Sequence, residues 1–357
     1  MSQSLNRVSW VDYAKGICIV LVVLMHSTLG VEKAVGAASW LHGFIDWAKP
    51  FRMPDFFLIS GLFLASRINR PWREYADSKI LHFAYFYILW MSIQFATKGY
   101  GIYQAEGAEG ALKAYGLGFV EPFGTLWFIY ILAVFFAVVK LTRSVPPVYV
   151  FVAAALLEMA PIETGYLLVD EFASRFVYFF TGYWLAAPVF AFAQGVNFKS
   201  VPVILSGLFI WALGNTFMVT NGYSHLPGFS LILGFIGAAA VISTGVLLSK
   251  TRIAAPLRYA GENSIVIYLA FFLFMASMRS LLLKYNVVSD LGSVALLTTA
   301  AGVLGPVLLF WATRHTKLSL LFRRPAWARL ATGPRQWHSD GHVTFNQPEA
   351  RGPSLSR

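Results

Sequence analysis

The sequence is poor in cysteine and in charge. Its 357 residues include one cysteine, Cys18, so an intramolecular disulfide and a cysteine-based metal cluster are both excluded. A single thiol leaves the redox compartment undetermined. Charged residues make up 13% of the chain, against about 25% in average soluble domains. An ordinary soluble domain is therefore excluded.

Several motifs of soluble enzymes are also missing. The sequence has no Gly-rich phosphate loop, no zinc-ligand spacing, no Gly-x-Ser-x-Gly elbow and no evident internal repeat. Its composition is instead strongly apolar, because 57% of the residues are hydrophobic and 16% are aromatic. The mean hydropathy of +0.61 indicates many apolar segments. The fold class we predict is an all-α polytopic membrane protein.

Apolar runs long enough to cross a bilayer recur along the chain, and they predict about ten transmembrane helices. Prolines interrupt the second and fifth. The first resembles a signal peptide, with a loose cleavage site at residues 34–36. Asp12 and the continuation of the apolar run to Val31 favour a retained span. The predicted spans are 14–31, 51–66, 80–97, 125–142, 145–160, 172–193, 201–219, 229–249, 264–283 and 293–313.

Loop charges predict the orientation of these spans, because short cytoplasmic loops are rich in Lys and Arg. Loops after even-numbered spans are basic, and the intervening loops are neutral or acidic. An even number of spans then places both termini in the cytoplasm. The basic loops carry Arg67, Arg70, Arg73, Lys79, Lys140, Arg143, Lys199, Lys250, Arg252 and Arg258.

The charge distribution also divides the chain into a cytoplasmic N-terminus, residues 1–13, a transmembrane domain, 14–313, and a basic cytoplasmic tail, 314–357. The tail holds eight Lys and Arg against two acidic residues, a net +6 of the overall +11. From about residue 325 it is rich in Pro, Gly, Ser and Arg, which predicts a largely disordered segment able to contact anionic lipid. Charges distributed by topology argue against nucleic-acid binding.

Two ionisable residues share one face of the first predicted helix. Lys15 and His26 are eleven residues apart, which is about 20° beyond three full turns and a rise of ~16 Å. With Lys15 at the cytoplasmic boundary, His26 lies about halfway through a ~30 Å hydrocarbon core. Asp12 is on roughly the same side and can pair with Lys15.

Both residues also have structural interpretations. Lys15 can extend to the interface without a specific role, and His26 can hydrogen-bond a neighbouring helix. An ionisable group at mid-depth is costly, so function is the default hypothesis for His26.

Lys15 and His26 also match the Arg/Lys-x10-His signature of the acyltransferase-3 membrane family, and the chain resembles this family along most of residues 7–285. The family consists of ten-helix proteins that O-acylate carbohydrates of the bacterial envelope, and the resemblance is greatest to its poorly characterised inner-membrane branch. Residues 54–61, 67–70, 126–128 and 263–268 resemble its FFxISG, Arg-x-x-Arg, LWF and NSxxIY segments.

The chain departs from the family pattern at the expected acceptor side. Many members have a histidine shortly after the tyrosine that corresponds to Tyr268, and here Leu269, Ala270 and Phe271 follow. No histidine stands directly before Leu126 and Trp127 either. If these histidines contact the acceptor in relatives, the acceptor here is expected to differ. Residues 314–357 contain no esterase-like domain, and further acceptor recognition is expected from loops or a partner.

The resemblance implies an O-acyltransferase that uses acyl-CoA, expected to be acetyl-CoA, as donor. His26 would act as general base or acyl carrier, since neutral imidazole can do either near pH 7. Lys15 would orient the donor. Arg67, Arg70 and Arg73 would bind its phosphates, although a plain topological role is equally consistent with Arg73.

For the acceptor, a carbohydrate or lipid-linked sugar, the resemblance directs attention to polar groups at span ends. Trp at an interface is also typical of a membrane belt. No metal is expected, and the implied location is the bacterial inner membrane. A transporter or flippase of an envelope precursor is the alternative, although no inverted halves with matched breaks are evident. The candidate acceptor-binding residues are Trp127, Glu158, Arg175 and Asn215.

Overall fold

The chain is helical throughout the residues that the computed structural model describes, 8–251 and 254–330. No strand occurs within them, so the all-α prediction is confirmed. Arg252 and the tail from residue 331 onward lie outside the described residues. The α-helices are α1 Ser9–Val35, α2 His42–Leu62, α3 Trp72–Tyr75, α4 His82–Leu117, α5 Trp127–Leu141, α6 Pro147–Met159, α7 Leu167–Trp184, α8 Ala186–Asn197, α9 Val201–Thr220, α10 Phe229–Ser249, α11 Ala255–Glu262, α12 Ser264–Tyr285 and α13 Leu291–Thr313.

Seven helical segments within the described residues are long and apolar enough to cross a membrane, and the protein is therefore a multi-pass membrane protein. Each of the ten predicted spans coincides with a helix or a helix pair. α2 does not qualify by composition because it carries Asp46, Lys49, Arg52 and Asp55, and α6 has only 13 residues. The count of ten stays a prediction. The seven are Ser9–Val35, Trp72–Leu117, Gly124–Ser144, Val201–Thr220, Phe229–Ser249, Ser264–Tyr285 and Leu291–Thr313.

Two predicted segments differ in detail from the structure. The single span expected at 172–193 is a pair of helices, α7 and α8, bent by 77° at Leu185. The loop expected after residue 97 continues as helix α4 to Leu117, with a break where Gly107 adopts a positive φ of 74°. Counting the bent pair as one span raises the number of candidate spans to eight. Hydropathy registers apolar length and does not register such bends.

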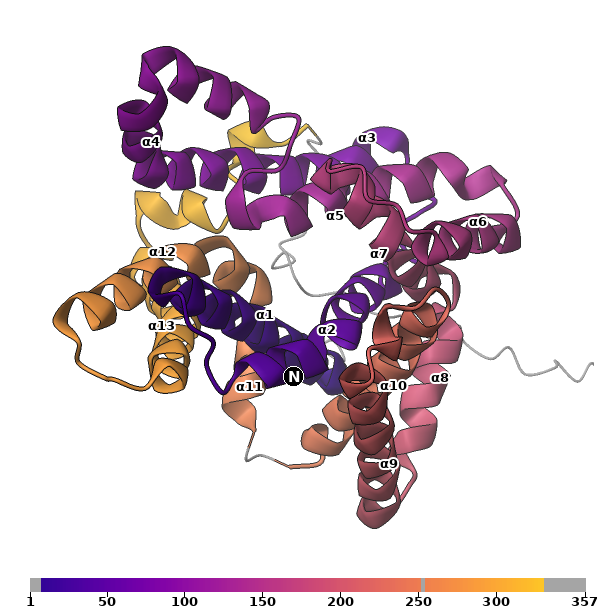
Figure 1. Ribbon diagram of the computed structural model, residues 1–357. Coiled ribbons are helices and arrows are strands. Elements are labelled where there is room, and N and C mark those ends of the chain that lie inside the picture. Colours follow the sequence, from indigo (N-terminus) through magenta and orange to yellow (C-terminus); the bar gives the residue numbers. More distant parts are fainter. Residues whose placement is uncertain (1–7, 252–253, 331–357) are drawn as a thin grey trace, which may run out of the picture.

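α1 lies in the middle of the helices, and it packs against α2, α10, α11, α12 and α13 (Figure 1). Glycines allow two of the closest approaches. A Cβ at Gly261 of α11 would collide with the carbonyl oxygen of Asp12 in α1. Likewise, a Cβ at Gly182 of α7 would meet the carbonyl oxygen of Leu58 in α2. Small residues at such contacts are how membrane helices bring their backbones together. The first contact packs α11 on α1, the helix that carries His26, and the second packs α7 on α2.

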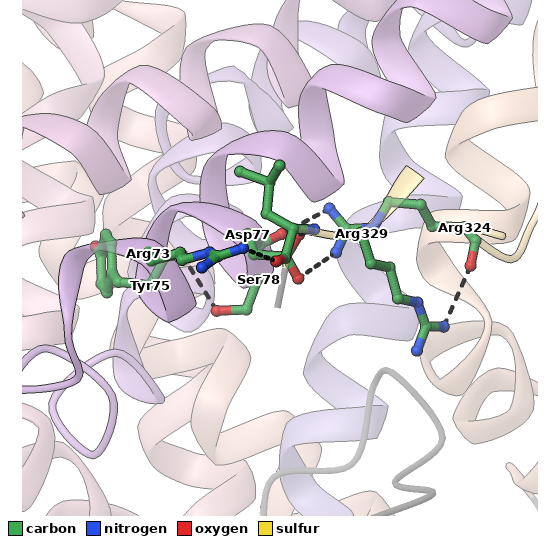
Figure 2. Close-up of polar contacts among 7 residues, drawn as sticks. Arg73, Tyr75, Asp77, Ser78, Arg324 and Arg329 are labelled. Carbon is green, nitrogen blue, oxygen red and sulfur yellow. Dashed lines mark hydrogen bonds and ion pairs between the residues drawn. The ribbon is translucent and has the colours of Figure 1, made fainter. Parts of the chain in front are cut away.

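The first part of the basic tail is packed against the body of the protein, unlike the disorder predicted from about residue 325. The Arg324 guanidinium donates to the backbone oxygen and to Oδ2 of Asp77, each at 2.7 Å. The backbone N–H of Leu330 donates to Oδ1 of Asp77 at 2.7 Å, and Arg73 Nη2 donates to the Leu330 oxygen at 2.9 Å (Figure 2). Asp77 lies in a π-helical turn, Ala76–Leu81, which leads into α4. We call residues 317–330 the C-terminal strap.

Substituting Asp77 with Asn is expected to release the C-terminal strap. Arg324 is 5% exposed, and the loss of the charge partner of a buried ion costs about 3–5 kcal/mol. If the strap opens locally, that cost corresponds to a rise of at least roughly 100-fold in the rate of tryptic cleavage after Arg329, which Leu330 follows in the strap. Cleavage is measured by mass spectrometry on the detergent-purified protein. Glu74→Gln, an exposed acid on α3, is the matched control, and an unchanged rate in Asp77→Asn would contradict the prediction.

The predicted orientation has its own test on either side of the predicted span 80–97. Reporter fusions at Arg73 and Glu109 are expected to report opposite sides of the membrane, with Arg73 cytoplasmic. An 18-residue span such as 80–97 rises ~27 Å, close to the ~30 Å hydrocarbon thickness. The same sidedness at both positions would overturn the ten-span topology and the depth assigned to His26.

Candidate active site

A cavity of about 220 Å³ lies among five helices, and His26 forms part of its wall. α1 and α2 supply its apolar side chains, and α5 and α12 supply aromatic ones. α7 contributes one carboxylate and one guanidinium group. The lining residues are Val22, Met25, His26, Arg52, Met53, Phe56, Trp127, Phe128, Glu171, Arg175 and Tyr268.

His26 is held on the uninterrupted helix α1, whose ends lie at Ser9 and Val35. Its imidazole packs against Phe271 of α12, with 5.4 Å between the ring centroids. The imidazole therefore has an aromatic neighbour and a cavity beside it. The structure thus places the predicted catalytic histidine where a substrate can reach it.

Lys15 occupies the same helix but a different environment. Its Nζ lies 5.6 Å from the centroid of the Phe63 ring at the end of α2, in the range of a cation–π contact. Lys15 is not among the residues that line the cavity. The continuous helix preserves the eleven-residue spacing, about 16 Å along the axis, and Lys15 is therefore separated from the cavity along α1.

The three predicted phosphate-binding arginines lie in the segment between α2 and the π-helical turn Ala76–Leu81. Arg70 precedes Pro71, which adopts an extended ψ of 146° before the short helix α3. Lys140 of α5 fixes this turn, because its Nζ donates to the carbonyl oxygens of Ile68 and Arg70. Arg70 and Arg73 are exposed, and Arg67 is partly buried. None of these arginines lines the cavity.

Two of the sequence segments that suggested the family meet in the cavity wall. The Tyr268 hydroxyl of α12 accepts a hydrogen bond from the Phe128 N–H at 3.0 Å and donates to the carbonyl oxygen of Thr125. The first N–H groups of a helix lack intrahelical partners, so this contact completes the start of α5. Phe128 also stacks on Phe56 of α2, with centroids 4.6 Å apart. These contacts position Trp127 at the cavity.

The predicted acceptor residues separate into two groups. Trp127 and Arg175 line the cavity with His26. Glu158 accepts a hydrogen bond from the Tyr178 hydroxyl at 3.2 Å, and Asn215 Nδ2 donates to the carbonyl oxygen of Trp47 at 2.9 Å. Glu158 and Asn215 therefore join helices outside the cavity wall.

Arg52 and Glu171 line the cavity, although the sequence analysis did not select either as a site residue. Glu171 pairs with Arg175 one turn later, with 3.2 Å between Oε2 and Nε. Arg52 is 7% exposed. The sequence contained a signal for Arg52, because an ionisable residue in an apolar span is a functional candidate by default. Asp55, three residues later, is fully buried and accepts a hydrogen bond from the Cys18 thiol at 2.6 Å.

Within residues 8–251 and 254–330, no three His, Cys, Asp or Glu side chains cluster at metal-binding distance. The charged groups of the cavity are two guanidinium groups and one carboxylate, beside a neutral or protonated imidazole. Such a set suits anion binding and proton transfer.

Comparison with protein families shows to which family the chain belongs. The model of the acyltransferase domain (Acyl_transf_3) matches residues 8–314. The chain belongs to the acyltransferase-3 family. Its matched region includes every helix from α1 to α13, and the resemblance seen in the sequence is confirmed.

Two curated relatives agree with this assignment. Inner membrane protein YcfT of Escherichia coli K12 is 23% identical over 72% of this chain and 77% of its own length. Nodulation protein NolL of Mesorhizobium japonicum is 23% identical over 74% of this chain and 75% of its own length. No solved structure matches the chain. The protein is thus a membrane acyltransferase by family, with distant relatives.

Proposed function

We propose that this protein transfers an acyl group, most simply acetyl, from acyl-CoA to a hydroxyl of an envelope carbohydrate or glycolipid in a bacterial inner membrane. The observation that carries the proposal is the position of His26 in the wall of a cavity between membrane helices, in a chain of the acyltransferase-3 family. The inner-membrane location is supported by the relative YcfT, which is named an inner membrane protein.

The imidazole of His26 supplies the chemistry in this proposal. As a general base it takes the proton of the acceptor hydroxyl while the hydroxyl oxygen attacks the thioester carbonyl carbon. The C–S bond then breaks, and the coenzyme A thiolate leaves and takes up a proton. As an acyl carrier, the imidazole nitrogen attacks the thioester carbonyl first, the C–S bond breaks and the coenzyme A thiolate leaves. In a second step the acceptor hydroxyl attacks the acyl-imidazole, the C–N bond breaks and the released imidazole takes up the hydroxyl proton. Both routes place the reacting carbonyl beside His26.

The donor is proposed to approach from the face that carries Arg67, Arg70 and Arg73. Guanidinium groups bind phosphate through paired charge-assisted hydrogen bonds, and coenzyme A carries phosphates at its nucleotide end. The pantetheine arm would extend past Lys15 along α1 toward His26. Arg73 also donates to the backbone of the C-terminal strap, so a phosphate there would share its guanidinium with the strap.

The acceptor is proposed to occupy the cavity. Trp127 offers an indole face on which a sugar ring can stack, and Arg175 and Glu171 offer polar groups. Glu158 and Asn215, which hold neighbouring helices, are expected to support the shape of this region.

A transporter or flippase of an envelope precursor is the second candidate. The 77° bend between α7 and α8 favours it, because broken helices often surround transport sites. A transporter would release no coenzyme A from acyl-CoA.

The deciding experiment is an assay of free thiol release from acetyl-CoA by the detergent-purified full chain. We expect release that depends on protein and rises when a carbohydrate acceptor is added. The acylated product is identified by mass spectrometry. Thiol release no faster than that of a mock-purified membrane fraction, across neutral and acidic sugar acceptors, would reject the acyl-CoA mechanism in favour of the transporter.

A further inference from the structure

Arg52 is a buried cation in the cavity wall, and within the described residues it has no ion-pair partner of its own. Its side chain is 7% exposed, and its Nη1 donates to the Ile45 carbonyl oxygen at a long 3.4 Å. The Nε of Arg52 has no hydrogen-bond partner within the described residues. The guanidinium nevertheless forms part of the cavity wall together with His26 and Trp127.

The nearby carboxylates are committed to other groups. Glu171 pairs with Arg175 at 3.2 Å, and Glu158 accepts from the Tyr178 hydroxyl at 3.2 Å. Asp46, about one and two-thirds turns before Arg52 on α2, is 55% exposed and lies 3.5 Å from His42. It attracts Arg52 electrostatically, but the two form no ion-pair contact within the described residues. Arg52 and Arg175 against Glu171 leave the cavity lining with an excess of positive charge.

A guanidinium in this position destabilises the folded state. An ion removed from water without a counterion carries a desolvation penalty of several kcal/mol, and an apolar or neutral residue would avoid it. Groups that destabilise the folded state are retained where a ligand uses them. The ligand chemistry that matches a guanidinium fork is a planar carboxylate or a phosphate, bound through two parallel hydrogen bonds.

We infer that the acceptor carries an oxyanion, the carboxylate of an acidic sugar or the phosphate of a glycosyl phosphate, and that Arg52 binds it. This inference rests on the proposed function and specifies its substrate class. With the oxyanion on Arg52 of α2 and the sugar ring against Trp127 of α5, a hydroxyl of the same sugar faces His26 of α1. Arg52 therefore selects the acceptor by charge and orients it for acylation.

The test compares three sugars for binding to the purified full chain in the absence of acyl-CoA. Methyl α-D-glucuronide carries a carboxylate, glucose 1-phosphate carries a phosphate, and methyl α-D-glucoside is the neutral control of the same ring. Isothermal titration calorimetry at low salt measures each affinity. A charge-assisted hydrogen bond contributes about 1.5–3 kcal/mol, so we expect at least one anionic sugar to bind ~10-fold or more tightly than the glucoside. The preferred anion identifies the source of the oxyanion.

Variants assign the preference to the residue. Arg52→Gln should bind all three sugars with equal affinity, and Arg52→Lys should keep a reduced preference because it retains charge and loses the fork. Arg279→Gln, an arginine on α12 beside Gly30 and outside the cavity lining, should leave the preference unchanged. Equal affinities in the wild type, or a full preference in Arg52→Gln, would overturn the inference.

The outcome is separable from that of the proposed function. Sugar binding requires no acyl transfer, so His26→Ala should retain the preference for the anionic sugar. Preference without any coenzyme A release would leave the Arg52 site standing and reject the acyltransferase mechanism. Acyl transfer to methyl α-D-glucoside and methyl α-D-glucuronide with equal KM would support the acyltransferase mechanism and reject the Arg52 site. Arg52→Gln should also unfold at a temperature no lower than the wild type, because it removes a buried charge.

Discussion

Replacing His26 with alanine is expected to reduce the rate of acyl transfer by at least 10²–10⁴-fold, the range that a positioned general acid–base group supplies. A carrier role would make the loss larger, since no acyl-imidazole can form. The folded protein should persist, because the imidazole faces a cavity on one side and one aromatic ring, Phe271, on the other. The measurement is kcat for coenzyme A release with saturating acceptor, together with the thermal midpoint in detergent.

The matched control is His225→Ala, an exposed histidine in the loop before α10, and it should behave as the wild type. Added imidazole is expected to restore part of the activity of His26→Ala, since the side chain leaves a space that opens into the cavity. An active His26→Ala protein would remove this residue from the chemistry.

The two roles of His26 predict different time courses. A carrier releases coenzyme A in a burst equal to the amount of enzyme when no acceptor is present. A general base shows no such burst, because the thioester is attacked only by the acceptor hydroxyl. Rapid mixing of acetyl-CoA with wild type and His26→Ala therefore distinguishes a covalent step from direct transfer.

Much of the fold follows from apolar length alone. The spans predicted from hydropathy coincide with helices because every backbone group in a bilayer must be satisfied within its own segment. The bend between α7 and α8 was not predicted, since residues 172–193 are apolar across it. The helical continuation of α4 past residue 97 was missed because Lys98 and the glycines that follow it are typical of a loop.

The site was predictable only in part. Helical periodicity put Lys15 and His26 on one face of α1, but it could not say which other helices border that face. The closeness of Arg52, Glu171 and Arg175 to His26 depends on how α2 and α7 pack, and this follows from contacts such as that between Gly182 and Leu58. Contacts of this kind join residues far apart in sequence, so no local pattern reveals them.

The C-terminal strap illustrates the same limit at the predicted donor face. Its composition resembles that of a disordered tail, yet Arg324 is 5% exposed and bonds to Asp77. The strap also engages Arg73 through Leu330. Changing Arg73 would therefore disturb the strap as well as any phosphate site. Arg67 and Arg70 are the pair to change.

Replacing Arg67 and Arg70 together with glutamine is expected to weaken acetyl-CoA binding by roughly 10-fold at low salt, since each lost charge-assisted contact at an exposed site contributes about 0.5–1 kcal/mol. The loss should shrink as salt rises to 1 M, where the Debye length falls to about 3 Å. Affinity for the acceptor sugar should stay as in the wild type, because neither arginine lines the cavity.

The control for this pair removes the same number of charges from the face predicted to be cytoplasmic. Arg143→Gln with Arg258→Gln changes the net charge equally, at exposed positions outside the turn that Lys140 holds in place. A general electrostatic attraction of acetyl-CoA to a basic surface would weaken both double variants alike, whereas a phosphate site weakens only the first. Calorimetric titration with acetyl-CoA at low and high salt separates the two. Unchanged affinity of Arg67→Gln/Arg70→Gln at low salt would leave these arginines as determinants of topology alone.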